Sequence, residues 1–227
     1  MQTSDSIVII PTYNEKENIE NIIRAVFGLE KCFHILIVED NSPDGTADIV
    51  RKLQAEFPER LFMIERKGKL GLGTAYIAGF KWALAHHYEY IFEMDADFSH
   101  NPQDLPRLYK ACAEEGGDVA IGSRYVSGVN VVNWPMGRVL MSYFASKYVR
   151  FITGIPVHDT TAGFKCYRRC VLQTIDLDNI RFKGYAFQIE MKFTAYKCGF
   201  KIIEVPVIFI NRELGTSRMN GSFFGEA

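Results

Sequence analysis

The sequence lacks long apolar runs and has no large excess of charge of either sign. No apolar stretch reaches the roughly 20 residues that a membrane-spanning helix needs, and the N-terminus lacks the basic region and apolar segment of a signal peptide. The 227 residues carry a formal net charge of -1. Because a basic surface is the usual signature of nucleic-acid binding, this balance gives no support for such a partner, and we expect none.

Cysteine is scarce and odd in number. The five cysteines stand mostly in apolar surroundings, which favours reduced thiols in a cytoplasmic protein over a disulfide framework. Cys166 and Cys170 form a loose pair with no second pair and no nearby histidine, which argues against a zinc site. Internal repeats, low-complexity segments and clear linkers are also missing. With 48% hydrophobic residues, the chain is predicted to form one folded domain over residues 1–227.

Short apolar runs alternate with segments of helical periodicity along most of the chain. The apolar runs predict strands at residues 6–10, 35–39, 61–64, 90–94, 118–122, 163–168 and 201–210. The periodic segments predict a helix behind Asn14 as N-cap and further helices at residues 46–57, 75–85, 102–112, 136–155 and 187–198. This alternation predicts an α/β fold with a mostly parallel, Rossmann-like sheet and helices on both faces. Pro206 interrupts the last strand and therefore indicates an edge position.

Two aspartates follow the predicted buried strand at residues 90–94. Asp95 and Asp97 stand one residue apart and are followed by turn-forming residues at 99–102. Because ligands of an open parallel sheet bind at the carboxyl ends of its strands, these carboxylates could hold Mg²⁺ or Mn²⁺ and bridge it to substrate phosphates. In the plainer interpretation, Asp97 caps the next helix and Asp95 ends the strand in water. The spacing alone favours the plainer interpretation, since Asp-x-Asp is short and common.

Three glycines form a second loop that invites a functional interpretation. The spacing of Gly68, Gly71 and Gly73 matches neither the dinucleotide fingerprint nor the phosphate-binding loop that ends in Gly-Lys-Ser/Thr. Gly73 leads into a predicted helix N-terminus, which suits an anion. A plain tight turn explains the loop equally well.

The predicted helix at residues 136–155 is unusually basic and aromatic. Arg138, Lys147 and Arg150 are interleaved with leucine, valine, tyrosine and phenylalanine. One interpretation is an ordinary amphipathic helix that packs on the core. The other is an interfacial helix that rests on lipid headgroups.

Taken together, the loops match a known order of motifs. They are Pro-Thr-Tyr-Asn-Glu at 11–15, Glu-Asp-Asn-Ser-Pro-Asp-Gly at 39–45, a glycine-containing segment at 71–80, Asp-Ala-Asp at 95–97, and later motifs at 122–126, 159–165, 182–190 and 212–218. In this order, and over nearly the whole chain, they resemble those of the inverting family 2 glycosyltransferases of GT-A fold. Within that family the chain is most similar to the dolichyl-phosphate and polyprenyl-phosphate mannosyltransferases.

This resemblance implies a reaction and a set of site residues. A hexose, with mannose from GDP-mannose favoured, would pass with inversion to a polyprenyl (dolichyl or undecaprenyl) monophosphate, with Mg²⁺ or Mn²⁺ as cofactor. The metal ligands would be Asp95 and Asp97. The catalytic residues would be Asp97, Arg124 and Arg138, and the acceptor phosphate would lie on Arg124, Arg138 and Ser142. The nucleotide-sugar would be bound by Pro11, Tyr13, Glu15, Asp40, Asp95, Lys183 and Arg212.

The resemblance also implies an organisation and a location. Residues up to about 122 would form the nucleotide-sugar half of the domain, and residues from about 123 to 227 the acceptor half. A lipid acceptor implies a peripheral position on the cytosolic face of a membrane, with residues 138–151 as the contact. A membrane-anchor subunit is a further partner that this location allows, and relatives are expected to continue into another helix beyond residue 227.

Some residues depart from the family pattern or have plainer interpretations. Ser99 stands where a glutamine often joins the metal ligands, and Arg218 stands where lysine is usual. Tyr13 could be a core aromatic residue, and Glu15 could be an acid in the first turn of a helix.

Two further acids could act in proton transfer or be structural. In the structural interpretation Glu190 pairs with Lys192 or Lys183, and Asp159 caps a turn.

Two rival functions also fit the motifs. One is a transferase of the same fold that uses a UDP-sugar, either UDP-glucose with polyprenyl phosphate or a glycan acceptor. The other is an inactive nucleotide-sugar-binding module. The arginine pair Arg124 and Arg138 favours a phosphate acceptor over a sugar hydroxyl, because guanidinium groups suit bidentate binding of phosphate. The intact Asp95 and Asp97 argue against an inactive module.

Overall fold

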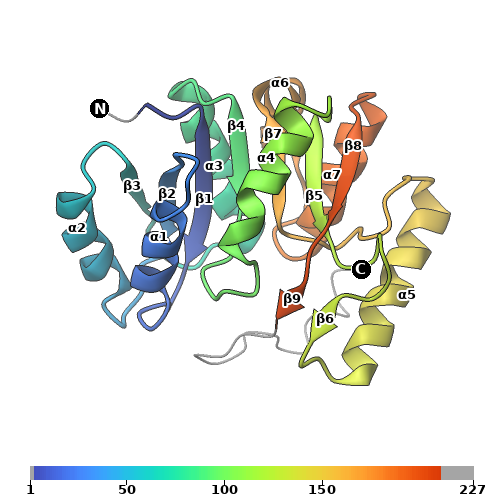
Figure 1. The fold of residues 1–227 in the computed structure, drawn as a ribbon, viewed down its shortest axis with the longest axis horizontal. Coiled ribbons are helices and arrows are strands. Elements are labelled where there is room, and N and C mark those ends of the chain that lie inside the picture. The colour runs from blue at the N-terminus through green and yellow to red at the C-terminus, as the bar shows by residue number, and fades with distance from the viewer. Residues whose placement is uncertain (1–2, 211–227) are drawn as a thin grey trace.

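The computed structural model describes residues 3–210, and a seven-stranded sheet of order β3-β2-β1-β4-β7-β5-β8 lies at its centre (Figure 1). The strands are β1 (Ser6–Thr12), β2 (His34–Glu39), β3 (Leu61–Glu65), β4 (Tyr90–Glu93), β5 (Val119–Ser123), β7 (Lys165–Arg168) and β8 (Ile202–Pro206). Neighbouring strands are parallel except that β7 runs antiparallel to both β4 and β5. The predicted mostly parallel sheet is confirmed, and β8 lies at an edge, as Pro206 indicated.

Helices cover both faces of this sheet. They are α1 (Ile19–Phe27), α2 (Thr46–Glu56), α3 (Leu72–Ala85), α4 (Leu105–Ala113), α6 (Arg169–Thr174) and α7 (Ala186–Lys197). Side chains of β1 alternate between two cores: Val8 and Ile10 pack with α1, α2 and α4, whereas Ile7 and Ile9 pack with α3, α6 and α7. All four are fully buried. A strand that is covered on both faces needs apolar side chains on both, and this explains the nearly continuous apolar run of β1.

A small second sheet and a long helix lie beside the carboxyl ends of the main strands (Figure 1). The sheet pairs β6 (Val131–Val132) with β9 (Phe209–Ile210) in parallel, and the helix is α5 (Met136–Thr153). The single strand predicted over 201–210 is thus two strands. The chain leaves the main sheet after Val207, whose N–H donates to the Ser123 carbonyl at 3.1 Å, and then pairs with β6.

The predicted N-cap role of Asn14 is wrong. The helix α1 begins at Ile19, and Asn14 has a φ of 55°, in the left-handed region that asparagine tolerates better than most residues. Its N–H donates to the Ser42 hydroxyl at 3.0 Å, which joins the loop after β1 to the loop after β2. The residues behind β1 therefore form a rim loop and not the first turn of a helix.

The core interpretation of α5 is also wrong. Ser146 is the one residue of this helix that is buried, and its exposed apolar residues include Leu140, Phe144, Tyr148 and Phe151. These four residues recur at helical spacing and form one stripe, which we call the α5 stripe. Within residues 3–210, no helix combines the length and the apolar character that crossing a bilayer requires.

Candidate active site

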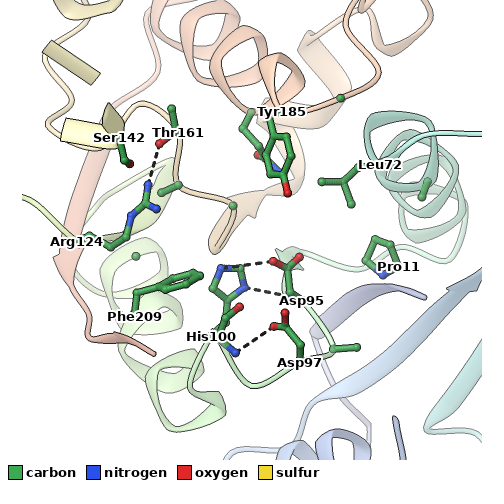
Figure 2. A pocket seen from close by; sticks show the side chains of 18 of the residues that line it. Pro11, Leu72, Asp95, Asp97, His100, Arg124, Ser142, Thr161, Tyr185 and Phe209 are labelled. Atoms are coloured by element: carbon green, nitrogen blue, oxygen red, sulfur yellow. Dashed lines mark hydrogen bonds and ion pairs between the residues drawn. The ribbon is translucent and has the colours of Figure 1, made fainter. Parts of the chain in front are cut away.

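A cavity of about 420 Å³ lies at the carboxyl ends of the central strands, and loops from both halves of the chain line it (Figure 2). Predicted site residues that line it are Pro11, Tyr13, Glu15, Asp40, Asp95, Asp97, Arg124, Arg138 and Ser142. Lys183 has an exposed side chain and does not line the cavity, although its neighbour Gly184 does. Arg212 and Arg218 lie outside the described residues. Figure 2 shows Arg124 and Ser142 across the cavity from Pro11 and Leu72.

At one end of the cavity, Asp40 is fixed by the partly buried Arg66. The two side chains form a bidentate ion pair, with Nε 2.6 Å from Oδ1 and Nη2 2.7 Å from Oδ2. The same guanidinium donates to the Thr74 hydroxyl at 2.8 Å, so it connects the end of β2 to the start of α3. Such a charge-assisted fork sets the direction of the carboxylate before any ligand arrives.

Tyr13 and Glu15 face the same end of the cavity, and their plainer interpretations are wrong. Tyr13 is half-buried at the cavity wall and not in either core, and the Lys69 ammonium lies 5.2 Å from its ring centroid. Glu15 is buried but precedes α1, and its Oε2 accepts from the Asn18 side chain at 3.0 Å. Both residues therefore contribute to the cavity wall.

The glycine loop bends at residues 67–68, and the N–H of Gly73 at the start of α3 is not available to an anion. The Gly73 N–H donates to the Lys183 carbonyl at 2.8 Å, so it is already paired. A Cβ on Gly73 would lie 2.8 Å from the Phe187 ring and 2.9 Å from the Phe182 carbonyl oxygen. Glycine is needed here because the start of α3 closely approaches Phe182 and the start of α7.

Asp95 and Asp97 stand in the loop that leaves β4, and Asp97 does not cap a helix. Its Oδ1 accepts from the Ser99 N–H at 3.1 Å, whereas the short helix Pro102–Asp104 is capped by Asn101. Loss of solvent, and then the charges of Asp97 and Glu93, raise the pKa of the Asp95 carboxyl from 3.8 to about 7. The loop thus concentrates negative charge, which a bound cation or a proton would relieve.

This pair of carboxylates fits a divalent cation. Within residues 3–210 no group of three or more histidine, cysteine, aspartate or glutamate side chains is arranged to hold a metal. Two carboxylates suit Mg²⁺ or Mn²⁺ when phosphate oxygens and water fill the remaining positions. The Ser99 hydroxyl at the cavity wall is buried without a hydrogen-bond partner in the described part of the chain, so it too fits a bound group there.

His100 is a cavity residue that the sequence interpretation missed. Its Nδ1 accepts from the Asp95 N–H at 3.0 Å, so the neutral ring carries its proton on Nε2 (Figure 2). The ring stacks on Phe164 with centroids 4.9 Å apart, and burial lowers the pKa of His100 to about 4. In the sequence, His100 stands among turn-forming residues. Its position close to two aspartates was the only sign that it belongs to the site.

At the other end of the cavity, Arg124 is held by Asp159. Its Nε and Nη2 donate to the two carboxylate oxygens at 2.7 and 2.6 Å, and Nη2 also donates to Thr161 at 2.8 Å. Burial works against both charges, but their attraction raises the pKa of Arg124 and lowers the pKa of Asp159. Asp159 is therefore an ion-pair partner and not a proton carrier, and a phosphate could use only the Nη1 side of Arg124.

Arg138 and Ser142 lie one helical turn apart at the start of α5, on its cavity side. The Arg138 guanidinium carbon is 4.0 Å from the centroid of the Trp134 ring. Burial lowers the pKa of Arg138 somewhat, yet an arginine stays charged at neutral pH. Positive charge is thus concentrated opposite the aspartates.

The structural interpretation of Glu190 needs correction. Its carboxylate accepts from the backbone N–H groups of Arg181 and Phe182 at 3.0 to 3.1 Å, and it holds their loop instead of pairing with a lysine. Lys192 is fully buried and donates to three backbone carbonyls. Neither group is placed for proton transfer in the cavity.

This cavity belongs to a chain that matches a known family. Residues 7–176 match the family described as Glycosyl transferase family 2. The chain belongs to glycosyl transferase family 2. It is 48% identical over 225 residues to the polyprenol monophosphomannose synthase of Mycolicibacterium smegmatis, which covers 99% of this chain and 84% of that relative. It is 45% identical over 221 residues to the undecaprenyl-phosphate mannosyltransferase of Micrococcus luteus, covering 97% of this chain and 90% of that relative.

Solved structures share the fold of this family 2 chain. A Pyrobaculum calidifontis mannosyltransferase in complex with GDP-Man and Mn²⁺ superposes with a TM-score of 0.59 at 19% identity, over 92% of this chain and 56% of that one. Glucosyl-3-phosphoglycerate synthase of Mycobacterium tuberculosis, with Mn²⁺, UDP and its product, gives a TM-score of 0.67 at 18% identity, over 97% and 75%. The predicted GT-A type of fold is confirmed.

Proposed function

We propose that this chain is an inverting mannosyltransferase that moves mannose from GDP-mannose to a polyprenyl monophosphate. The observation that carries the proposal is one cavity with carboxylates at one end and arginines at the other. Such a cavity suits a metal-bound sugar nucleotide that meets an anionic acceptor. The names of two relatives at 45–48% identity support mannose and a polyprenyl phosphate as the transferred sugar and the acceptor.

The donor would lie on the residues behind β1, β2 and β4. Asp40, already oriented by Arg66, would bind the nucleoside, with Pro11, Tyr13 and Glu15 around it. A divalent cation on Asp95 and Asp97, when bound, would neutralise the charge that develops on the leaving diphosphate. His100 keeps the backbone of Asp95 in place.

The acceptor would lie on Arg138, Ser142 and the Nη1 side of Arg124. A lipid phosphate is already anionic at neutral pH, so the attacking oxygen needs no strong general base. The cavity agrees with this, because His100 is neutral with Nδ1 occupied and Asp159 is paired. Attack on the sugar from the side opposite the diphosphate would invert the anomeric centre. The boundary between donor half and acceptor half near residue 122 then falls at the end of β5.

The α5 stripe supports a peripheral position on the cytosolic face of a membrane. One side of α5 lines the cavity through Arg138 and Ser142, while the stripe on its other side is exposed. An interfacial helix of this kind would bring a membrane-bound phosphate to the cavity without a crossing segment. Lys147 is exposed on the same helix and would meet anionic headgroups.

A transfer assay with labelled donors tests the function. GDP-mannose and UDP-glucose are each incubated with the protein, Mn²⁺ and a short-chain polyprenyl phosphate, and the labelled lipid is extracted. We expect label in the lipid from GDP-mannose only. Transfer from UDP-glucose would support the rival transferase, and saturable donor binding without any transfer would support the binding module.

A further inference from the structure

Trp134 lies against both arginines at the acceptor end of the cavity. It stands between β6 and α5 and lines the cavity. The centroid of its ring is 4.0 Å from the guanidinium carbon of Arg138 and 5.4 Å from that of Arg124. Phe209 of β9 meets the ring edge-on, with centroids 5.2 Å apart.

Stacking, and not hydrogen bonding, holds this indole. Its Nε1–H is buried and has no hydrogen-bond partner within residues 3–210. A buried donor without a partner weakens a fold, so the polar edge does not account for a tryptophan here. The ring face does, because it attracts a guanidinium through its quadrupole without using any N–H donor.

The two arginines are fixed in different ways. Arg124 is fixed by the Asp159 carboxylate, which takes two donors and offsets the positive charge. Arg138 stacks on an aromatic ring, which orients the guanidinium plane. The direction in which Arg138 presents its N–H groups to a phosphate therefore depends on that ring.

We propose that Trp134 is a positioning residue whose ring face holds Arg138 in the orientation that binds the phosphate of the polyprenyl acceptor. The inference rests on the proposed function for the identity of that acceptor. It predicts that loss of the ring weakens the acceptor and spares the donor.

Steady-state kinetics of Trp134→Leu and Trp134→Phe give the first test. Leucine keeps an apolar side chain without a ring, whereas phenylalanine keeps a smaller ring. We expect Trp134→Leu to raise the KM for a short-chain polyprenyl phosphate about ten- to thirty-fold and Trp134→Phe about three-fold. The KM for GDP-mannose should stay within about two-fold in both. Equal losses toward both substrates, or a phenylalanine variant as poor as the leucine variant, would overturn the inference.

Tryptophan fluorescence gives a second test that needs no turnover. The sequence has two tryptophans. Trp82 of α3 packs against Phe62 and His86 and does not line the cavity. In a Trp82→Phe background, Trp134 reports alone on a ten-carbon isoprenyl phosphate, with the alcohol of the same length as control. We expect a saturable change with the phosphate, none with the alcohol, and at least ten-fold weaker binding in Arg138→Ala. A response to the alcohol as strong as to the phosphate would contradict the inference.

The two tests separate this inference from the function beneath it. A saturable phosphate response without mannose transfer from any donor would sink the proposed function and leave the role of Trp134 standing. Mannose transfer with a normal acceptor KM in Trp134→Leu would support the proposed function and exclude the role of Trp134. Melting curves of both variants identify a misfolded one, in which case Trp134→Phe and the fluorescence titration decide.

Discussion

Single residues divide the cavity into a negative end and a positive end. Asp95 and Asp97 follow β4 at the negative end, whereas Asp40 and Asp159 are each held through both carboxylate oxygens by an arginine. Asp40 and Asp159 are therefore oriented by their arginines, whereas the crowding of Asp95 with Asp97 and Glu93 favours a cation at the end of β4.

The first residue-scale prediction concerns Asp97. Replacement by alanine removes one of two carboxylates that would hold the metal, so we expect mannose transfer to fall at least a hundred-fold, as EDTA should also do. Asp48→Ala on the surface of α2 is the matched control and should behave like the parent. Transfer rates with Mn²⁺, and melting curves to show an intact fold, are the measurements. Full turnover in EDTA would exclude the metal role.

The second residue-scale prediction follows from the pKa of Asp95, which the fold raises to about 7. A folded-state pKa above the unfolded value of about 3.9 means that ionisation of Asp95 weakens folding as pH rises from about 4 to 7. Asp95→Asn removes this penalty. Since the Asp95 side chain is 42% exposed, we expect only about 1–2 kcal/mol of added stability at pH 8, or roughly 2–8 °C in Tm.

That gain should vanish near pH 4, and Mn²⁺ with GDP should stabilise the parent but not the variant. Melting curves of the metal-free proteins at pH 4, 6 and 8 measure it. An Asp95→Asn protein that is less stable than the parent at pH 8 would contradict the assignment of the raised pKa.

The position of a site residue could be predicted from the sequence only where neighbouring residues determine that position. Asp95 follows an apolar run directly, so its position at a strand end was predictable. Asp159 lies 35 positions from Arg124 in the sequence, and nothing local indicates that the two would meet. His100 was hidden for the same reason, because its value lies in a ring stacked on distant Phe164 and a bond to a backbone N–H.

Among the elements, α5 is the one whose role depends on what covers its apolar side. Its periodicity predicted a helix and left open whether a core or a membrane covers it. In the structure the α5 stripe does not pack on the core, and its side chains are exposed, up to 85% for Phe151. The antiparallel direction of β7 was not predictable either, since a short apolar run carries no sign of its direction.

The element-scale prediction is that the α5 stripe binds membranes. Phe144→Ser with Phe151→Ser should reduce sedimentation with vesicles that contain anionic lipid by about ten-fold or more, because two large apolar side chains no longer insert. Tyr196→Ser on α7, 37% exposed, is the control for an aromatic residue elsewhere. Binding of the parent should weaken as salt rises, since Lys147 contributes through charge. Equal binding to neutral and anionic vesicles at every salt concentration would count against this contact.

At the scale of the whole molecule, a buried polar cluster joins a strand from the first half of the chain to a strand and a helix from the second half. Glu93 ends β4, Lys165 begins β7, and Gln188 lies on α7; all three are buried. Lys165 Nζ lies 3.1 Å from Glu93 Oε1 and donates to Gln188, whose own Nε2 donates to Glu93 at 2.8 Å. Glu93 of this cluster lies two residues before Asp95, and its bonds to Lys165 and Gln188 hold β7 and α7 against the end of β4.

Removal of one partner from this cluster should therefore damage the whole fold. Lys165→Met leaves the Glu93 carboxylate buried without its cation, and we expect a loss of about 3–5 kcal/mol in the free energy of unfolding. Glu93→Gln added to Lys165→Met removes the charge and lets the two glutamines bond to each other, so most of that loss should return. Arg51→Met, which breaks an exposed pair with Glu65, should change stability by less than about 1 kcal/mol. Urea unfolding followed by circular dichroism measures all three, and a double variant as unstable as Lys165→Met would show that the lysine acts through packing and not through its charge.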